Sequence, residues 1–210
     1  MKQVILSLGV LSLFSSCVKH EKLDGNNVEF KETYFEIEEV ISMEVPNDQF
    51  SWIPGLFNCM SIPLGQTIDY NAFIPTVNPN PFAHLTDEIR PKSIKMELTN
   101  IPDCDFDMLE SVEIFLCDNG ITDENQFILF DPSNPNNGYN AAKIGEFLNF
   151  SAGIGNTIYL DVESDAILEQ FIHAGTFQTY AKMVFDKAFT EESAIIKTTM
   201  ELNVRLINEE

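Results

Sequence analysis

Apolar and polar positions alternate most clearly near the C-terminal end of the chain. From 196 to 206 every second residue is apolar or Thr, and the residues between them are polar or charged. A period of two is typical of a β-strand with one face on a core and the other in water. The same alternation recurs at 94–99 and 158–163. The runs 111–117 (SVEIFLC), 126–130 (QFILF) and 177–186 (FQTYAKMVFD) are also rich in strand-forming residues.

Other segments complete the expected layout. One or two strands are expected within 28–45. The segment 46–91 holds seven of the ten prolines and is expected to cross the surface with one short strand near 68–73. Turn residues fill 118–120 and 131–140. The best helix is 164–174, capped by Ser164 or Asp165 and stopped by Gly175, and 141–150 is a candidate second helix.

These patterns predict the fold class. Several short strands separated by turns, without regular alternation of strands and long helices, favour an all-β protein. We expect a single antiparallel β-sandwich of about eight strands, Ig-like or jelly-roll-like, with one or two short helices.

The N-terminal residues carry the clearest signal for the cellular location of the protein. Lys2 precedes an apolar run at 4–14, and Ser15 and Ser16 stand immediately before Cys17. A run of about 11 apolar residues is typical of a secretory signal and too short to span a bilayer as a mature helix. The whole segment resembles the signal of bacterial lipoprotein precursors, whose lipidated cysteine becomes the first mature residue.

That resemblance implies cleavage after residue 16, lipidation of Cys17 and attachment to a membrane through the lipid. In such lipoproteins an aspartate after the cysteine favours the inner membrane. Val18 stands there, so the outer membrane is expected, and Lys19 and Glu21 resemble tails that direct some lipoproteins to the cell surface. From about position 91 onward the strand layout is similar to that of β-sandwich lipoproteins of Gram-negative envelopes. The expected organisation is a signal peptide (1–16), a lipidated flexible tether (17–27) and a sandwich domain (28–210).

Charge and composition narrow the possible partners. The formal net charge is −21, and no cluster of Lys or Arg offsets it. Such a surface repels nucleic acid and anionic lipid headgroups, so nucleic-acid binding is excluded. A hydrophobic content of 44%, with 17 phenylalanines, is ample for a packed core.

Cysteine and histidine positions indicate structural roles. Beyond Cys17 the chain has Cys59, Cys104 and Cys117, an odd number that leaves at least one thiol unpaired. Cys104 and Cys117 form the most local pair, and three buried free thiols are the alternative. The three histidines, His20, His84 and His173, are isolated and lack zinc-site spacing.

Acidic loops are the candidate metal sites. Asp103, Asp105 and Asp107 alternate with other residues, which suits the oxygen ligands of Ca²⁺, although Met108 and Ile114 exclude an EF-hand loop. Two further oxygen-rich loops lie at 118–125 and 131–137. The residue types of each loop are equally explained by ordinary turn formation. A calcium site would be favoured if the three loops met at one end of the sandwich. No other cofactor is expected.

No catalytic motif is found. The sequence has no G-x-S-x-G, and Gly153 and Gly155 lack the third glycine of a phosphate-binding loop. No spacing rule singles out a carboxylate pair for glycoside cleavage. We therefore expect a protein that is not an enzyme.

An aromatic segment is the candidate recognition surface. Trp52 and Phe57 belong to a set of aromatic residues interleaved with prolines between 50 and 82. Rings beside polar groups can stack on sugars, or they can simply cover one end of the core. The favoured function is a surface binding or adhesion module for a glycan or protein. The alternative is a periplasm-facing accessory subunit of an envelope complex.

Overall fold

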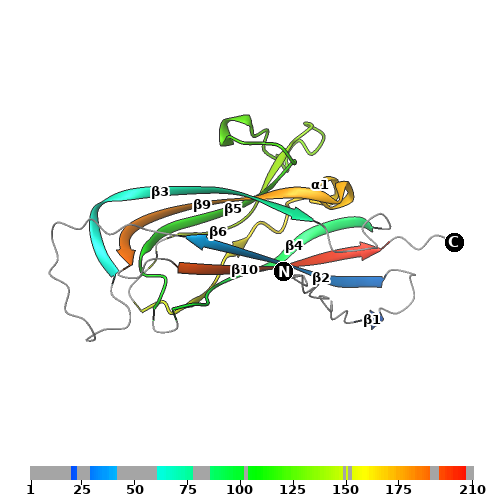
Figure 1. Cartoon of the computed structure of the whole chain (residues 1–210). Coiled ribbons are helices and arrows are strands. Elements are labelled where there is room, and N and C mark those ends of the chain that lie inside the picture. The colour runs from blue at the N-terminus through cyan, green and yellow to red at the C-terminus, as the bar shows by residue number, and fades with distance from the viewer. Residues whose placement is uncertain are drawn as a thin grey trace, which may run out of the picture.

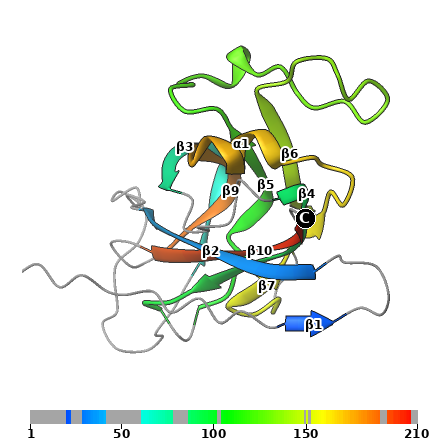
Figure 2. The ribbon, with the colours of Figure 1, turned by 90° about the vertical axis from the view of Figure 1, so that its right-hand side faces the viewer.

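The computed structural model describes residues 20–22, 29–41, 61–77, 86–101, 104–148, 150, 153–189 and 194–206. Two stacked antiparallel sheets contain all the strands of these residues (Figures 1 and 2). The first sheet has the order β1 (His20–Lys22), β2 (Glu29–Ile41), β10 (Ala194–Leu206), β4 (Thr86–Leu98) and β7 (Thr157–Tyr159). The second has the order β3 (Ser61–Val77), β9 (Thr176–Phe189), β5 (Leu109–Cys117), β6 (Ala141–Leu148) and β8 (Asp161–Val162). The predicted all-β sandwich is confirmed.

Strand β10 shows how alternation produces this fold. It lies in the middle of the first sheet, between β2 and β4. Ile196, Met200 and Leu202 are almost completely buried, and Lys197 and Glu201 between them are only partly buried. Burial of each large apolar side chain contributes about 1.5–3 kcal/mol. The alternating C-terminal run therefore supplies one wall of the core.

Each end of the space between the sheets is closed by residues of a connection. At one end the helix α1 (Glu169–Ala174) inserts Phe171 and Ile172, both fully buried. At the other end the loop before β5 inserts Phe106 and Met108, which are also fully buried. The helix ends at Gly175, whose φ of 75° is left-handed, as expected for a glycine C-cap.

The helix predictions need two corrections. The segment 141–150 was expected to be helical, but strand β6 covers Ala141–Leu148 and pairs with β5 along its length. Cross-strand pairing and burial outweigh the helix propensity of its alanines. Helix α1 begins at Glu169, because Leu168 instead donates its backbone N–H to the carbonyl oxygen of Ile89 (3.1 Å) and no side chain caps the helix.

The strand predictions need two corrections as well. The apolar run 126–130 forms no strand and contributes only an isolated bridge between Leu129 and Ala141, since β9 and β6 already occupy both edges of β5. By contrast, the proline-rich region contains β3, a 17-residue strand. Pro63 and Pro75 are tolerated there because β3 is an edge strand of the described sheet.

The local cysteine pair is not formed. Cys104 is disulfide-bonded, whereas Cys117 is a buried free thiol. Cys104 belongs to the core between the sheets, and Cys117 belongs to a cluster on the opposite, outer face of the second sheet. The sheet itself separates the two sulfur atoms, which sequence distance alone could not indicate.

Candidate binding site on the outer face of the second sheet

A long connection leaves the sandwich between β5 and β6. It spans residues 118–140 and contains the short 3₁₀ helix η2 (Glu124–Gln126). Figures 1 and 2 show it in green and yellow-green, projecting from the second sheet on the side away from β2 and β10. Connections longer than about 12–15 residues are uncommon in compact domains and are often functional. We call residues 118–140 the β5–β6 excursion.

The excursion covers an aromatic ladder on the outer face of the sheet. Phe73 of β3, Tyr180 of β9 and Phe115 of β5 lie directly opposite one another across the strands. The ring centroids of Phe73 and Tyr180 are 4.5 Å apart. Phe127 of the excursion packs on all three rings at centroid distances of 5.3–6.2 Å. This packing leaves Tyr180 only 1% exposed and Phe115 8% exposed.

Polar contacts fasten the first half of the excursion to the same strands. The Tyr180 hydroxyl donates to the carboxylate of Glu124 (2.9 Å), and the Lys182 ammonium lies 3.5 Å from the same oxygen. The Gly120 N–H donates to the side-chain oxygen of Gln178 (2.9 Å). Burial, and then the hydrogen bond to Glu124, raise the pKa of Tyr180 above its usual value.

The second half of the excursion is held by Asn140 and Tyr139. The Asn140 side chain accepts from the backbone N–H of Ile128 (2.7 Å) and donates to the carbonyl oxygen of Gln126 (3.0 Å). The Tyr139 hydroxyl donates to the carbonyl oxygen of Ile167 (3.0 Å), just before α1. Burial, with a smaller effect of nearby acidic groups, raises the pKa of Tyr139 to about 12. The excursion is therefore an ordered element with anchors at both ends.

A pocket of about 350 Å³ opens between the excursion and the sheet. Its floor is formed by Glu113 and Phe115 of β5 and by Lys143 of β6. Phe115 and Lys143 are direct cross-strand partners, so their side chains share the outer face. A register shift between Ile114 and Phe115 places Lys143, and not the buried Ile144, opposite Phe115. The floor thus combines an aromatic ring, an ammonium group and a carboxylate.

Two walls flank this floor. Leu129, Phe130 and Pro132 of the excursion form the apolar wall, and Leu129 remains 49% exposed. The opposite wall is the turn after β8, which contributes Glu163, Asp165 and Ala166. The β5–β6 strand pair, the excursion between its strands and the turn after β8 therefore meet around one pocket.

Ion pairs hold the acidic wall in place. The Lys143 ammonium lies 3.0 Å from the carboxylate of Glu146 and 3.3 Å from that of Glu163. Burial opposes the charged form of Lys143, but these two hydrogen bonds outweigh it and raise the pKa of the ammonium. Lys143 consequently stays protonated at neutral pH and is shared by two carboxylates.

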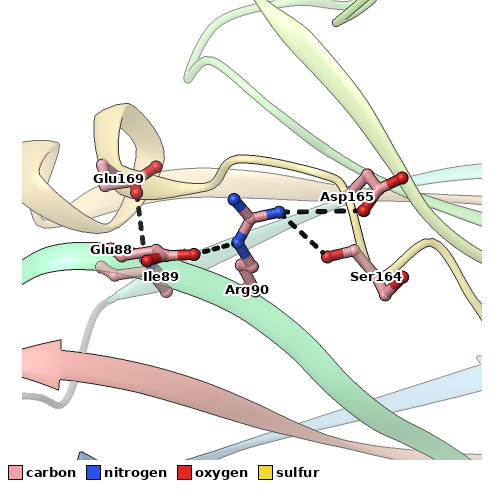
Figure 3. A network of polar contacts seen from close by, with 6 residues as sticks. All are labelled: Glu88, Ile89, Arg90, Ser164, Asp165 and Glu169. Carbon is pink, nitrogen blue, oxygen red and sulfur yellow. Dashed lines mark hydrogen bonds and ion pairs between the residues drawn. The ribbon is translucent and has the colours of Figure 1, made fainter. Parts of the chain in front are cut away.

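Arg90 of β4 holds the same turn from the other side (Figure 3). Its guanidinium donates to the carbonyl oxygen of Ser164 (3.3 Å), lies 4.0 Å from the carboxylate of Asp165, and pairs with Glu88. Figure 3 also shows Glu169, whose carboxylate accepts the backbone N–H of Ile89 (3.0 Å) and joins α1 to β4. The wall is thus connected to the first sheet.

The acidic loops act as turn caps in this structure. The Asp105 carboxylate accepts the backbone N–H groups of Asp107 (3.1 Å) and Gly153 (3.2 Å), and Asp107 pairs with Lys187 (3.0 Å). Asp123 and Asp131 each accept hydrogen bonds from residues two positions later. These contacts satisfy the carboxylates with protein donors.

The three acidic loops do not gather at one end of the sandwich. Asp105 and Asp107 precede β5, whereas the other two loops follow it. A nine-residue strand spans roughly 27 Å. Among the residues for which placement is given, no group of three or more His, Cys, Asp or Glu side chains is arranged to hold a metal ion. Calcium binding by Asp103, Asp105 and Asp107 stays a prediction, because Asp103 lies outside those residues.

Several predicted functional residues also lie outside the described residues. Cys17, Trp52 and Phe57 are among them. Lipidation and the aromatic platform therefore stay predictions. No helix in the described ranges has the length and apolar character needed to cross a membrane. His173 lies in the last turn of α1, the position expected from its sequence.

Sequence reasoning missed the pocket residues Glu113, Phe115 and Lys143. A signal for them exists in the run Ile114-Phe115-Leu116-Cys117. Consecutive apolar residues in a strand mean that both faces of the strand are covered. All four are buried, the outward pair by the excursion.

The sequence was also compared with known proteins. No protein-family model matches it, and no curated protein matches it.

Proposed function

We propose that the protein is a non-catalytic outer-membrane lipoprotein, attached through Cys17, that acts as a surface binding or adhesion module for a protein or glycan ligand. The observation that carries the binding proposal is the pocket between the β5–β6 excursion and the outer face of the second sheet. An ordered 23-residue connection forms one wall of this pocket. Anchored loops on a rigid sheet are a common way of presenting a binding site.

The exposed apolar residues around the pocket support the same proposal. Ile128 and Leu129 are adjacent in the excursion and are 52% and 49% exposed. Apolar side chains gathered at a pocket, such as Leu129 with Phe130 and Pro132, are typical of ligand-contacting surfaces, whereas a single exposed apolar residue outside it is ordinary. Leu129 lines the pocket, and Ile128 does not appear in its lining.

The binding proposal is tested with intact cells that display the lipidated protein. Cells are applied to arrays of glycans and purified surface proteins, with Leu129→Lys as the pocket variant and Ile128→Lys as the matched control. We expect Leu129→Lys, which replaces part of the apolar wall by an ammonium group, to reduce retention at least tenfold, whereas Ile128→Lys retains most of it. Equal retention of both variants would contradict a binding role for the pocket.

The location is tested by protease treatment of intact cells, read with an antibody against 196–206. We expect digestion without lysis, and we expect Cys17→Ala to release the protein from the membrane fraction. A Cys17→Ala protein that stays membrane-bound would overturn the lipid anchor.

A periplasm-facing accessory subunit is the second candidate, favoured by the edge strand β3. In the described sheet β3 pairs on one side only, with β9, and Ile68 and Val77 on it are 41% and 74% exposed. Such an edge can accept a strand from a partner protein. Protection from protease until lysis would support this function, and cross-linking from position 77 would then identify the partner.

A further inference from the structure

We propose that the pocket binds an organic cation, namely an alkylammonium or guanidinium group on a short hydrocarbon, and that Glu113 is the carboxylate that pairs with it. This inference rests on the proposed binding function and names the chemistry of its ligand. It is carried by the charges, the apolar surface and the size of the pocket.

The charges of the pocket favour a positive ligand. Its lining contains three carboxylates, those of Glu113, Glu163 and Asp165, and one ammonium, that of Lys143. Lys143 is already paired with both Glu146 and Glu163, so an anion would have to compete with two carboxylates at 3.0 and 3.3 Å. The acidic surface of the whole chain, with a net charge of −21, further disfavours anions and attracts cations.

Glu113 is the carboxylate available for pairing. Its cross-strand partners are Glu146 on β6 and Lys182 on β9. Lys182 is directed to Glu124, at 3.5 Å, and within the described part of the chain the carboxylate of Glu113 makes no hydrogen bond or ion pair. Like charges directly opposite each other in a sheet are destabilising, as in the Glu113–Glu146 pair. A cation bound at Glu113 would relieve that repulsion.

The apolar surface fits the hydrocarbon part of such a ligand. Phe115, Leu129, Phe130, Pro132 and Ala166 make up the rest of the lining. Aliphatic stems of amines pack on apolar surface, and a cationic group is attracted to an aromatic face. The nine lining residues include no hydroxyl or amide side chain, so all the polar side chains of the pocket are charged. The volume of about 350 Å³ lies at the small end of ligand sites.

The test is an NMR titration of the mature protein, purified in detergent. Agmatine tests a free small amine, and a short peptide with one central lysine and blocked ends tests a side chain presented by a protein. Neutral controls are the same peptide with acetylated lysine and a sugar alcohol. We expect either cation to shift the amide signals of Phe115, Leu129 and Lys143, with affinity that falls as salt is added.

Substitutions identify which carboxylate pairs with the bound cation. We expect Glu113→Gln to weaken cation binding about tenfold, the size of a charge-assisted hydrogen bond. Glu110→Gln, on the exposed part of the same strand, should leave the affinity unchanged. The spectrum of each free variant reports whether the fold is intact, and Glu113 is only partly buried.

Three results would overturn the inference in different ways. If the neutral controls shift the same signals as strongly, the pocket is a binding site but not for cations. If Glu113→Gln binds the cations like the wild type, Glu113 is not the carboxylate that pairs with them. If no cation shifts these signals, the cation chemistry is wrong. The proposed binding function is then decided by the cell-retention experiment with Leu129→Lys.

Discussion

At the scale of single residues, Cys117 has an environment that suppresses its reactivity. It is fully buried beneath the β5–β6 excursion, and its thiol lies 3.6 Å from the carbonyl oxygen of Gln178. Burial, with a smaller contribution from Asp118, raises its pKa to about 12. Since the thiolate is the reactive form, we expect no reaction with a disulfide reagent at about pH 8 in the folded protein.

Unfolding provides the contrast for this prediction. In denaturant without reductant Cys117 should react, whereas Cys104 should react only after reduction, because it is disulfide-bonded. If Cys17 carries the lipid, Cys59 is the cysteine left to pair with Cys104, and peptide mapping of a non-reduced digest identifies the partner. Labelling of Cys117 in the folded protein would show that the excursion does not protect it.

The role of a residue could be predicted from the sequence only where the backbone conformation at that single position decides the role. Gly175 ends α1 as expected, because a left-handed C-cap is a local requirement. Glu113 and Lys143 could not be predicted, since they become neighbours in a pocket only through the pairing of β5 with β6. For the acidic loops, the sequence did not decide between two roles. Their composition fits both calcium binding and turn formation, and in the structure Asp123 and Asp131 cap turns.

At the scale of elements, the β5–β6 excursion is separable from the core. Its base is already closed, because Asp118 donates its backbone N–H to the carbonyl oxygen of Asn140 (2.9 Å). We expect replacement of 119–139 by Asn-Gly, a favoured hairpin turn, to leave a folded sandwich. Exposure of Phe115 and Tyr180 should cost about 2–3 kcal/mol and lower Tm by about 5–10 °C. Thermal unfolding by circular dichroism measures this.

The same variant should bind more of a dye that reports exposed apolar surface. Only Phe130 and Tyr139 of the excursion pack against the core between the sheets, and the buried residues of that core lie outside the excursion, so unfolding should remain a single cooperative transition. Loss of cooperative unfolding would show that the excursion is part of the fold rather than an addition to it.

Element types were predictable where the pattern had a clear period. The alternating runs at 94–98 and 196–206 lie in β4 and β10. The run 126–130 was wrong as a strand because both edges of β5 are already paired, so Phe127 and Phe130 pack on other side chains while Ile128 and Leu129 stay exposed. The segment 141–150 was wrong as a helix because the pairing of 141–148 with β5 decides its conformation. Which strands pair with one another depends on residues that are far apart in the sequence. The local period of apolar positions does not reveal that pairing.

At the scale of the whole molecule, acidity sets the dependence of stability on pH. Burial raises the pKa values of Asp105, Asp118 and Glu169 above their usual values. A carboxyl group with a raised folded-state pKa contributes stability that is present at low pH and lost as pH rises through that pKa. The net charge of −21 acts in the same direction, because repulsion grows as carboxyls ionise. The protein should therefore be more stable near pH 5 than at neutral pH.

Glu169 allows the burial effect to be separated from the general charge effect. Its pKa is raised by burial and by Glu88, against the opposing influence of its hydrogen bond from Ile89 and of Arg90. Glu169→Gln keeps an oxygen to accept the Ile89 N–H but does not ionise. Glu110→Gln removes the same formal charge at an exposed position.

We expect Tm to fall between about pH 5 and pH 7.5 in the wild type and nearly as steeply in Glu110→Gln, but less steeply in Glu169→Gln. Net-charge repulsion changes equally in the two variants, so a flatter curve in Glu169→Gln alone assigns the difference to the buried carboxylate that joins α1 to β4. Scanning calorimetry across this range measures the slopes. Parallel curves for the two variants would instead mean that overall charge accounts for the pH dependence of Tm. Ionisation of Glu169 would then not destabilise its contact between α1 and β4.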